Sequence, residues 1–296
     1  MNARLLFVHA LTPLHPGTGQ GVGVIDLPVA REKATGLPYL PGSSLKGTLR
    51  DAYRGPRRAD IFGPDPANAP EHAGSAQFSD QRLLLLPVRS LRGTFAWATS
   101  PYVLRRFSRD ARETPMSGTP EHVPIPELTA CAIAEGSRLV VPALTKVVLE
   151  DLDLAPCTDP AVGAWAAWLG ARLFPDGEVE AAAWRAMLAE RLCVVSDDVL
   201  NFLLTTALEV TARVRLEDSA KTVAQGGLWY EEALPAETVL AGLAVVTPVE
   251  AVWRRQALDA ETVFAELASV AAAPLQFGGK ATVGRGICRV RFGGAG

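Results

Sequence analysis

Apolar and polar residues follow strand-like or helix-like periods along most of the chain. The mostly apolar run 4–12 predicts a strand that ends before Pro13. Leucines four residues apart then predict a helix that begins at Ser43 or Ser44, both good N-cap residues, and ends near Arg54. Further strands in the first hundred residues are expected at 24–29, 76–78, 83–88 and 95–97.

The same periods continue through the rest of the chain, with polar and proline-rich loops between them. A run dominated by Ala, Trp and Leu at 161–192, split by a Pro-Asp-Gly turn, predicts a helical hairpin that is a satellite of the main fold. Other helices are expected after the cap residue Ser100 and at 197–208 and 258–272, and a last strand at 288–292. Loops are expected at 16–23, 55–76 and 112–127.

A second, different hairpin is predicted at 209–242. Apolar residues alternate with polar ones on both sides of a polar, glycine-containing segment at 218–227. That segment is too polar to be core, so it is the expected tip of a β-hairpin that projects from the protein.

The order of these elements indicates the fold class. A strand, a helix, several strands, a helix and a strand predict an α+β domain with a ferredoxin-like (RRM-like) core. We expect one domain over 1–296 with two insertions, a helical subdomain at 155–195 and the hairpin at 209–242. Glycine-rich loops beside the first helix and the last strand would then lie close together.

Composition narrows the function without identifying it. The 296 residues are 48% hydrophobic, which is enough for a sizeable core, and 29 Lys and Arg nearly balance 32 Asp and Glu. This balance argues against a protein that coats nucleic acid indiscriminately, but it leaves room for a local basic track. Arginines are dense near 50–58, 82–109 and 285–291, although scattered arginines more often solvate surface faces.

Cysteine usage and hydropathy restrict the compartment and the metal chemistry. The four cysteines include no C-x-x-C pair, so neither a cysteine metal site nor a disulfide framework is expected. No secretion signal opens the sequence and no apolar run reaches membrane-spanning length. A cytoplasmic protein with no membrane contact is therefore the expectation.

Known glycine motifs for nucleotide binding fit this chain poorly. In the dinucleotide fingerprint G-x-G-x-x-G, Gly17 and Gly19 would be followed by a third glycine where this chain has Val22. Gly279 and Lys280 resemble the end of a phosphate loop, but the next residue is Ala rather than Ser or Thr. Both generic nucleotide sites are therefore disfavoured.

The helix predicted near residue 43 has features of a phosphate site. Lys46 lies in its first turn, where the helix dipole disfavours a cation, and a bound phosphate would explain that placement. The neighbouring candidates for RNA binding are Gly42, Ser43, Ser44 and Arg50. A second basic glycine loop supplies the facing half of the same groove, with Gly278, Gly279, Lys280 and Arg285 as candidates that contact phosphates rather than bases. An ordinary turn would explain these glycines but not the basic residues among them.

A lone carboxylate, Asp26, follows the first glycine loop between Ile25 and Leu27. Beside a phosphate track it is a candidate metal ligand or proton acceptor, whereas in isolation it would more often cap a turn. His15 lies on the turn before the same loop and is either a structural residue or a second catalytic candidate.

Several long motifs in the same order resemble one known family. They lie at 14–19, 23–28, 38–47, 87–97, 228–232 and 277–286. On these motifs the chain resembles, over essentially its whole length, the repeat-associated mysterious protein (RAMP) superfamily. Within it, the chain is similar to the repeating backbone subunits of type III-B CRISPR effector (Cmr) complexes.

The resemblance implies a hand-shaped subunit with a ferredoxin-like palm, a helical finger insertion and a β-hairpin thumb. Copies of it would polymerise along a guide RNA (crRNA) together with other Cmr subunits. Each thumb would flip a base out of the duplex between the guide and a single-stranded target RNA. An acidic residue would cut the target beside that kink, at regular intervals and with a divalent metal, Mg²⁺ or Mn²⁺.

The resemblance also assigns roles to residues. Asp26 matches the nuclease carboxylate and would be the protein's ligand to the metal. Glu231 is a further catalytic candidate, with a plain role on the face of a strand as the alternative. Trp229 and Tyr230 are candidates for contact with RNA, although Trp229 would serve equally well in the core.

Two rival functions stay open. One is a structural filament subunit that binds guide RNA without cutting, which Asn or Ala at position 26 would have favoured. The other is a stand-alone endonuclease that processes guide precursors, which would use an acid–base histidine and no metal.

Overall fold

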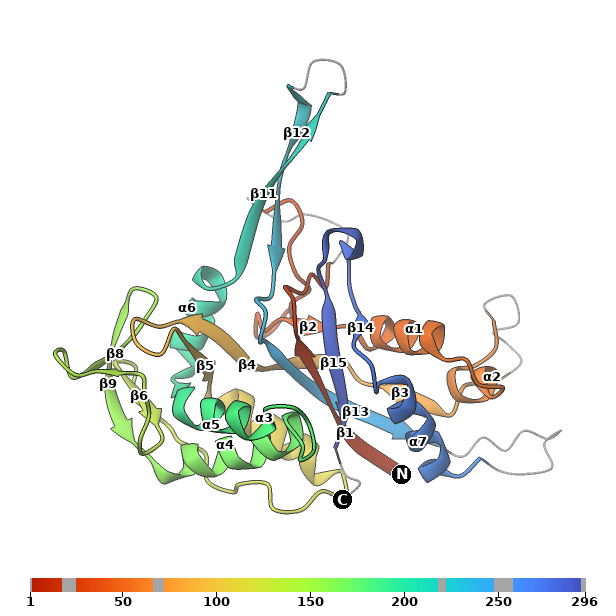
Figure 1. Cartoon of the computed structure of the whole chain (residues 1–296), viewed down its shortest axis with the longest axis horizontal. Coiled ribbons are helices and arrows are strands. Elements are labelled where there is room, and N and C mark those ends of the chain that lie inside the picture. Colours follow the sequence, from red (N-terminus) through yellow and green to blue (C-terminus); the bar gives the residue numbers. More distant parts are fainter. Residues whose placement is uncertain (1, 18–24, 66–71, 218–221, 248–257, 294–296) are drawn as a thin grey trace.

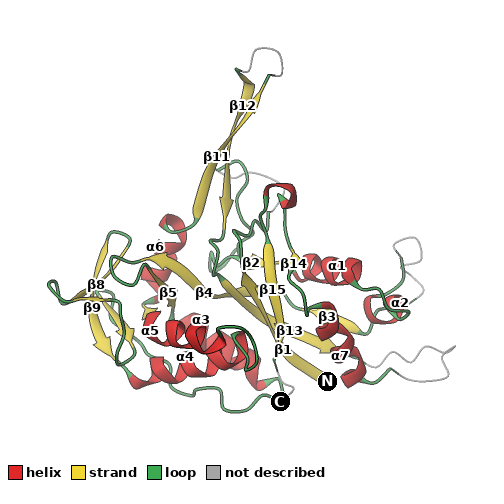
Figure 2. Ribbon diagram, in the orientation of Figure 1, coloured by secondary structure: helices red, strands yellow, loops and turns green. Residues whose placement is uncertain are grey.

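The computed structural model describes residues 2–17, 25–65, 72–217, 222–247 and 258–293. One large mixed sheet runs through the molecule, and helices cover it (Figures 1 and 2). Its strands are β1 (Asn2–Ala10), β2 (Tyr39–Leu40), β3 (Ala76–Phe78), β4 (Gln81–Arg89), β5 (Phe95–Thr99), β6 (Ala130–Ile133), β7 (Val140–Val141), β8 (Lys146–Leu149), β9 (Leu152–Thr158), β10 (Leu192–Val195), β13 (Val239–Val246), β14 (Leu275–Gln276) and β15 (Ile287–Phe292). The α+β class expected from the sequence is confirmed at this level.

Seven α-helices in the described ranges lie between groups of these strands along the chain. They are α1 (Gly42–Ala52), α2 (Arg58–Phe62), α3 (Pro101–Arg112), α4 (Pro160–Leu173), α5 (Ala181–Arg191), α6 (Asp197–Thr206) and α7 (Ala260–Val270). None of the helices in the described ranges is long and apolar enough to cross a membrane.

The centre of the sheet is antiparallel and joins the two ends of the chain. The strand order there is β15-β1-β13-β4, with β1 between two strands that come almost 240 and 290 residues later. Phe7, for example, faces Ala241 on one side and Arg291 on the other. The central strands lie among apolar neighbours, so they are almost continuously hydrophobic rather than alternating.

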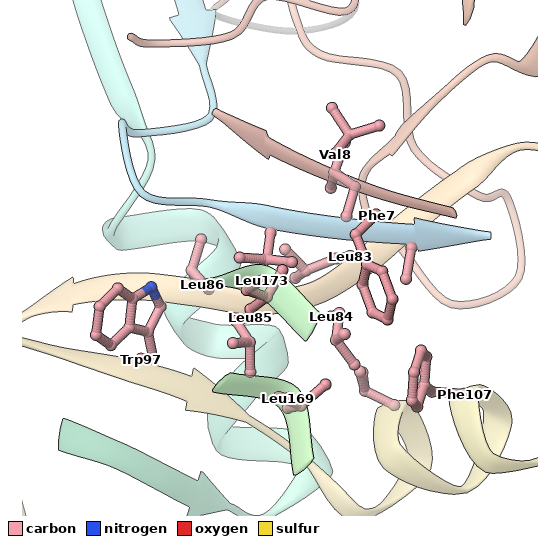
Figure 3. Packing of buried hydrophobic residues seen from close by; sticks show 14 of the residues in the cluster. Phe7, Val8, Leu83, Leu84, Leu85, Leu86, Trp97, Phe107, Leu169 and Leu173 are labelled. Atoms are coloured by element: carbon pink, nitrogen blue, oxygen red, sulfur yellow. The ribbon is translucent and has the colours of Figure 1, made fainter. Parts of the chain in front are cut away.

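The segment between β4 and the projecting hairpin extends this sheet. Strands β5, β10, β6, β9, β8 and β7 continue it in that order, and α4 and α5 pack beside β10 and β5. Trp165 and Leu169 of α4 are fully buried in the same hydrophobic cluster as Leu84 and Phe107 (Figure 3). The helical hairpin predicted at 161–192 is present, but its expected satellite position is wrong because it shares the main core.

The second hairpin stands apart from the sheet. Strands β11 (Glu209–Leu216) and β12 (Val223–Ala233) form their own two-stranded sheet and project from the body (Figure 1). The predicted end at residue 242 is wrong, because 239–246 is β13, a central strand of the main sheet. Of the predicted tip at 218–227, residues 218–221 lie outside the described residues and Val223 already belongs to β12.

Local signals located most helices. The Ser100 and Ser196 hydroxyls cap α3 and α6, as the sequence predicts. Ser43 and Ser44, in contrast, lie inside α1, and the residue before that helix is Pro41, without a side-chain cap. The strand expected at 24–29 is a set of isolated bridges instead, and its first residue lies outside the described ones.

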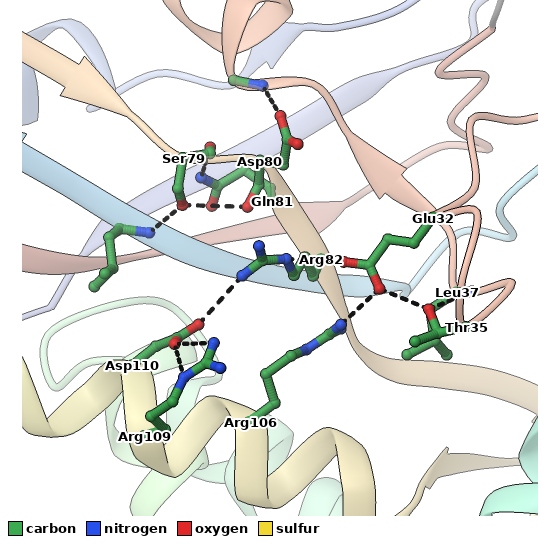
Figure 4. A network of polar contacts seen from close by, with 12 residues as sticks. Glu32, Thr35, Leu37, Ser79, Asp80, Gln81, Arg82, Arg106, Arg109 and Asp110 are labelled. Carbon is green, nitrogen blue, oxygen red and sulfur yellow. Dashed lines mark hydrogen bonds and ion pairs between the residues drawn. The ribbon is translucent and has the colours of Figure 1, made fainter.

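A charged network fixes the loop between the first two strands. Glu32 accepts from Arg106 of α3 at 2.7 Å and contacts Arg82 of β4 at 2.9 Å (Figure 4). The pKa of Glu32 is lowered, because hydrogen bonds and the charges of both arginines outweigh the effect of burial. The loop is therefore attached to the sheet and to α3 before it reaches β2.

Because α4 belongs to the main core, we expect Leu169→Ala to destabilise the whole protein. Leu169 is fully buried, and the cavity left by its side chain should cost about 2–5 kcal/mol in denaturant unfolding. Val179→Ala, at a position that is 92% exposed, should change the free energy of unfolding by less than about 0.5 kcal/mol. A separate early transition in Leu169→Ala, with the main one unchanged, would contradict a shared core.

Candidate functional site

Three segments far apart in sequence meet at the base of the projecting hairpin. They are 14–17 with 25–31, residues 230–234 at the end of β12 and directly after it, and the loop between β14 and β15. Leu14 exchanges two backbone hydrogen bonds with Leu234, at 2.9 and 2.8 Å, and Leu27 forms a parallel bridge with Glu231. The β12 edge that does not pair with β11 is therefore covered by the segment that contains Asp26.

Asp26 is exposed and is held by the hairpin backbone. Its Oδ2 accepts from the Tyr230 amide at 2.8 Å. On the next residue, the Leu27 amide donates to the Tyr230 carbonyl at 3.1 Å, and the Leu27 carbonyl accepts from the Glu232 amide at 3.0 Å. One carboxylate oxygen thus fixes the side chain, while the other has no hydrogen-bond partner within the part of the chain that the structure describes.

Glu232 anchors the same segment from inside. Its side chain is buried, and its two oxygens accept from the Val29 amide at 2.9 Å and from Arg31 at 2.7 Å. Arg31 also donates to the Leu204 carbonyl of α6 at 2.9 Å. Sequence reasoning did not select either residue, because nothing in the local pattern pairs side chains 201 positions apart.

Glu231 lies on the face of β12 and is saturated with donors. Lys280 at 2.8 Å, the Trp229 indole at 2.7 Å and Arg213 at 3.3 Å all contact its carboxylate. Burial alone would raise the pKa of Glu231, but the hydrogen bonds and the charge of Lys280 lower it to about 2. The carboxylate stays ionised and neutralised at physiological pH, which suits a structural contact better than proton transfer.

His15 is buried where the first glycine loop meets the β14–β15 loop. Its Nδ1 lies 2.6 Å from the Glu232 carbonyl, and because a carbonyl only accepts, Nδ1 carries the proton. Its Nε2 faces Gly17, where a Cβ would lie 2.6 Å away. The His15 carbonyl accepts from the Gly279 amide at 3.0 Å, so the residue joins three segments.

Both the glycines and the basic residues of the second glycine loop make contacts within the protein. Gly278 has a φ of +71°, and a Cβ there would lie 2.3 Å from the His15 carbonyl oxygen, which explains the glycine. Lys280 is neutralised by Glu231 and lies over the Trp229 ring. Arg285 is buried, donates to Thr211 at 3.0 Å and leaves its Nη1 without a hydrogen bond.

The start of α1 is partly occupied by protein. The Gly42 amide donates to Asp80 at 2.9 Å, so a carboxylate already lies at this positive helix end (Figure 4). Ser43 and Lys46 line an open cleft of about 550 Å³. Ser44 lies next to them in the first turn of the helix.

Two other residues predicted to contact RNA differ in their surroundings: Arg50 is bonded within the protein, and Tyr230 lies on an open surface. Arg50 donates to the Gly63 carbonyl at 2.7 Å and pairs with Asp65, which ties down the segment after α2. Tyr230 is 39% exposed on the hairpin face that Leu228 and Val214 share. That face is open to a ligand or partner. The opposite face, which carries Trp229, is covered by the side chains that contact Glu231.

A divalent metal would find few protein ligands here. Among the described residues there is no group of three His, Cys, Asp or Glu side chains placed to hold a metal ion. The adjoining stretch 18–24 contains none of these residue types in the sequence. Asp26 offers one oxygen that is not bonded to any described residue, so water and RNA phosphates would have to supply most of the coordination of Mg²⁺.

The buried environment of Glu231 predicts a pH-dependent loss of stability. Glu231→Gln should lower the free energy of unfolding at pH 7 by about 2 kcal/mol, because it removes charge-assisted bonds to Lys280 and Arg213. The pKa is lowered on folding, so this stabilisation is present above pH 4.5 and is lost as the pH falls toward 2.

Denaturant titrations between pH 7 and pH 3 would measure this effect. The stability of the wild type should fall more steeply on acidification than that of Glu231→Gln. The exposed Glu135→Gln is the matched control and should behave like the wild type. Parallel pH profiles for Glu231→Gln and the wild type would show that this carboxylate does not stabilise the fold.

Comparisons with known proteins agree over almost the whole chain. A model of the RAMP superfamily matches residues 7–289. The chain is 36% identical over 300 residues to the CRISPR system Cmr endoribonuclease Cmr4 of Pyrococcus furiosus, covering 98% of this chain and 95% of that protein. It is 24% identical over 307 residues to the CRISPR system CMR subunit Cmr4 of Saccharolobus solfataricus, with coverage of 97% and 95%.

Solved structures give the same result. The crystal structure of oligomeric Cmr4 from Pyrococcus furiosus superposes with a TM-score of 0.74 at 27% identity, covering 99% of this chain and 98% of that one. A cryo-EM structure of the type III-B Cmr-beta complex bound to cognate target RNA matches with a TM-score of 0.69 at 20% identity, with coverage of 99% and 97%, and supports the fold alone. The family match and the full-length identity show that this chain belongs to the RAMP superfamily and, within it, to the Cmr4 family.

Proposed function

We propose that this protein is the repeating guide-RNA-binding subunit of a type III-B Cmr complex and that it cleaves target RNA. The observation that carries the proposal is Asp26, an exposed carboxylate held at the base of the projecting hairpin by the Tyr230 amide. The 36% identity to a protein described as a Cmr endoribonuclease supports it. Its partners are crRNA, single-stranded target RNA, further copies of itself and other Cmr subunits, in the cytoplasm.

The proposal divides the molecule into palm, finger and thumb. The antiparallel order β15-β1-β13-β4, with α1 after β1 and α7 before β15, supports the proposal of a ferredoxin-like palm. The inserted region around 155–195 is the finger, and β11 with β12 is the thumb. The thumb lies beside the proposed catalytic carboxylate, so a base displaced by it exposes a phosphate near Asp26.

Asp26 has the properties of a group that acts on the 2′-hydroxyl of RNA. Its exposed carboxylate can orient that hydroxyl or accept its proton as the 2′-oxygen attacks the neighbouring phosphate. The bond from phosphorus to the 5′-oxygen of the next nucleotide then breaks, that oxygen takes a proton from water, and a 2′,3′-cyclic phosphate is left. The fixed bond to the Tyr230 amide holds the carboxylate in one orientation, which saves ordering entropy when RNA binds. His15 and Glu231 are positioned as supports for this region, because both are already bonded within the protein.

A divalent cation, Mg²⁺ or Mn²⁺, belongs to the proposal as a group shared with RNA. Asp26 would supply one oxygen ligand, and the cation would stabilise negative charge on the phosphate. The sparse donor set argues for weak binding in the absence of RNA.

The RNA backbone track is proposed along the start of α1. Lys46 and Ser43 at the open cleft, with the exposed part of the hairpin, form its surface. Because Lys46 lines this open cleft, its charge is available to phosphates. Lys280 and Arg285 border this surface but are already bonded to the hairpin.

We expect Asp26→Asn to reduce target cleavage by at least about 100-fold without changing target affinity. Asparagine retains an oxygen that accepts from the Tyr230 amide, so the substitution removes the charge and preserves the local structure. The assay uses labelled target RNA and the reconstituted complex under single-turnover conditions. Asp153→Asn, an exposed change on β9, is the control and should cleave normally.

The same assay separates the rival functions. A chelator such as EDTA should stop cleavage, and added Mg²⁺ or Mn²⁺ should restore it. Cleavage that survives the chelator would favour a metal-independent processing enzyme, and a wild-type complex that binds target without cutting it would favour a structural filament subunit. Normal cleavage by Asp26→Asn would remove Asp26 from the reaction.

We expect Lys46→Ala to weaken guide RNA binding equally for unrelated guide sequences. A lost phosphate contact should reduce the slope of log affinity against log salt by about one. Fluorescence anisotropy over a range of salt concentrations measures both effects, and Lys146→Ala on the remote strand β8 is the matched control. A loss limited to particular guide sequences would mean that Lys46 contacts bases.

A further inference from the structure

Glu232 is a buried carboxylate, and the two donors to its side chain among the described residues, Val29 and Arg31, both follow closely after Asp26 in the sequence. It is 5% exposed, and each of its oxygens has one donor. Oε2 accepts from the Val29 amide, three residues after Asp26, and Oε1 accepts from Arg31. A buried carboxylate is stable only with such donors, so its position fixes theirs.

Arg31 extends this attachment to the body of the protein. One of its terminal nitrogens donates to both Glu232 and the Leu204 carbonyl near the end of α6, and the other donates to the Gly36 carbonyl at 3.2 Å. Its planar guanidinium can satisfy acceptors in several directions at once, which an ammonium group cannot do with the same geometry. The hairpin base, the Asp26 segment and α6 are thereby joined through one side chain.

These contacts lie directly behind Asp26. Between them, residues 26–29 make four bonds to two β12 residues: Asp26 and Leu27 with Tyr230, Leu27 with Glu232, and Val29 with the Glu232 side chain. If Val29 loses its bond to the Glu232 side chain, the bonds of Asp26 and Leu27 to β12 remain. These lie at the surface, where water competes for them.

From this geometry we propose that Arg31 and Glu232 are positioning residues for Asp26, an inference that rests on the proposed catalytic function of that carboxylate. The pair locks the register between the Asp26 segment and β12. The hairpin and the carboxylate therefore move as one unit, and a displacement of the hairpin base by RNA or by a neighbouring subunit carries Asp26 with it.

The expected effect is on the rate of cleavage rather than on binding. Loss of a group that orients a reacting side chain typically costs about 10–100-fold in activity. Arg31→Met, which keeps the length and removes the donors, should lower single-turnover cleavage by that factor. Target and guide affinities should stay within about twofold, because neither residue is proposed to contact RNA.

Two further variants test whether the effect depends on the guanidinium group of Arg31. Arg31→Lys retains the charge opposite Glu232 but cannot contact all three acceptors, so its rate should lie between those of the wild type and Arg31→Met. Arg57→Met is the matched control, since it removes an ion pair with Glu266 at 3.2 Å, far from the hairpin. It should cleave at the wild-type rate.

Hydrogen exchange on the full-length subunit tests the positioning without any assay of activity. In Arg31→Met and Glu232→Ala, amides at 27–31 should exchange faster while those of β1 and β13 keep their protection. Uniformly faster exchange would mean general destabilisation, and unchanged exchange at 27–31 would mean that the segment does not depend on the pair. Either result would overturn the proposal.

The outcomes also separate this inference from the proposed function. If Asp26→Asn abolishes cleavage but Arg31→Met cleaves normally, the positioning role fails and the catalytic role of Asp26 stands. If Asp26→Asn cleaves normally, the catalytic role fails, whatever the exchange data show. A loss of RNA affinity in Arg31→Met with a reduced salt dependence would make Arg31 a phosphate contact instead.

Discussion

The candidate site depends on hydrogen bonds to the backbone groups on one edge of strand β12. At the base of the hairpin, β12 pairs with β11 on one side, and its other edge would leave amides and carbonyls without partners. Segments that begin at Leu14 and Asp26 supply those partners. The need to pair this edge therefore brings Leu14 and Asp26 together at the base of the hairpin.

The two neighbouring carboxylates of the site have opposite environments. Glu231 is buried among two cations and an indole, and its pKa falls to about 2. Asp26 is exposed, with one backbone donor and no cation in hydrogen-bonding contact among the described residues. The surroundings of the two carboxylates, rather than their residue types, therefore give Glu231 a structural role and leave Asp26 available to a ligand.

The sequence predicted regular elements better than side-chain partnerships. Strong periods and capping serines located α3, α6 and five strands of the sheet, β1, β3, β4, β5 and β15. The region 130–158 forms four strands that were not predicted, and three of them, β6, β7 and β8, are too short to establish a period. The helix α1 begins after Pro41 because the Gly42 amide finds Asp80, a partner 38 residues away that the sequence around the helix cannot reveal.

The same limit applies to the site. Asp26 stood out because it is a lone carboxylate in an apolar stretch after a glycine loop, and the structure places it on the surface. The attachment of that segment depends on Arg31 and Glu232, whose meeting is a product of the tertiary fold. The basic glycine loop was predicted as a phosphate surface, yet Lys280 pairs with Glu231 and Gly279 bonds to His15. Spacing along the chain indicated the charge of this loop but not its partners.

The position of β1 has a consequence for synthesis of the protein on the ribosome. Its two neighbours in the sheet, β13 and β15, end at Val246 and Phe292, so β1 remains unpaired until almost the entire chain has been made. Such distant pairing is slow and leaves an apolar strand exposed in the nascent chain. The region from β5 to α6 contains its own helices and strands and can acquire structure earlier. We therefore expect chaperone dependence to concentrate on the first strand, and a truncation before β15 to abolish formation of the site.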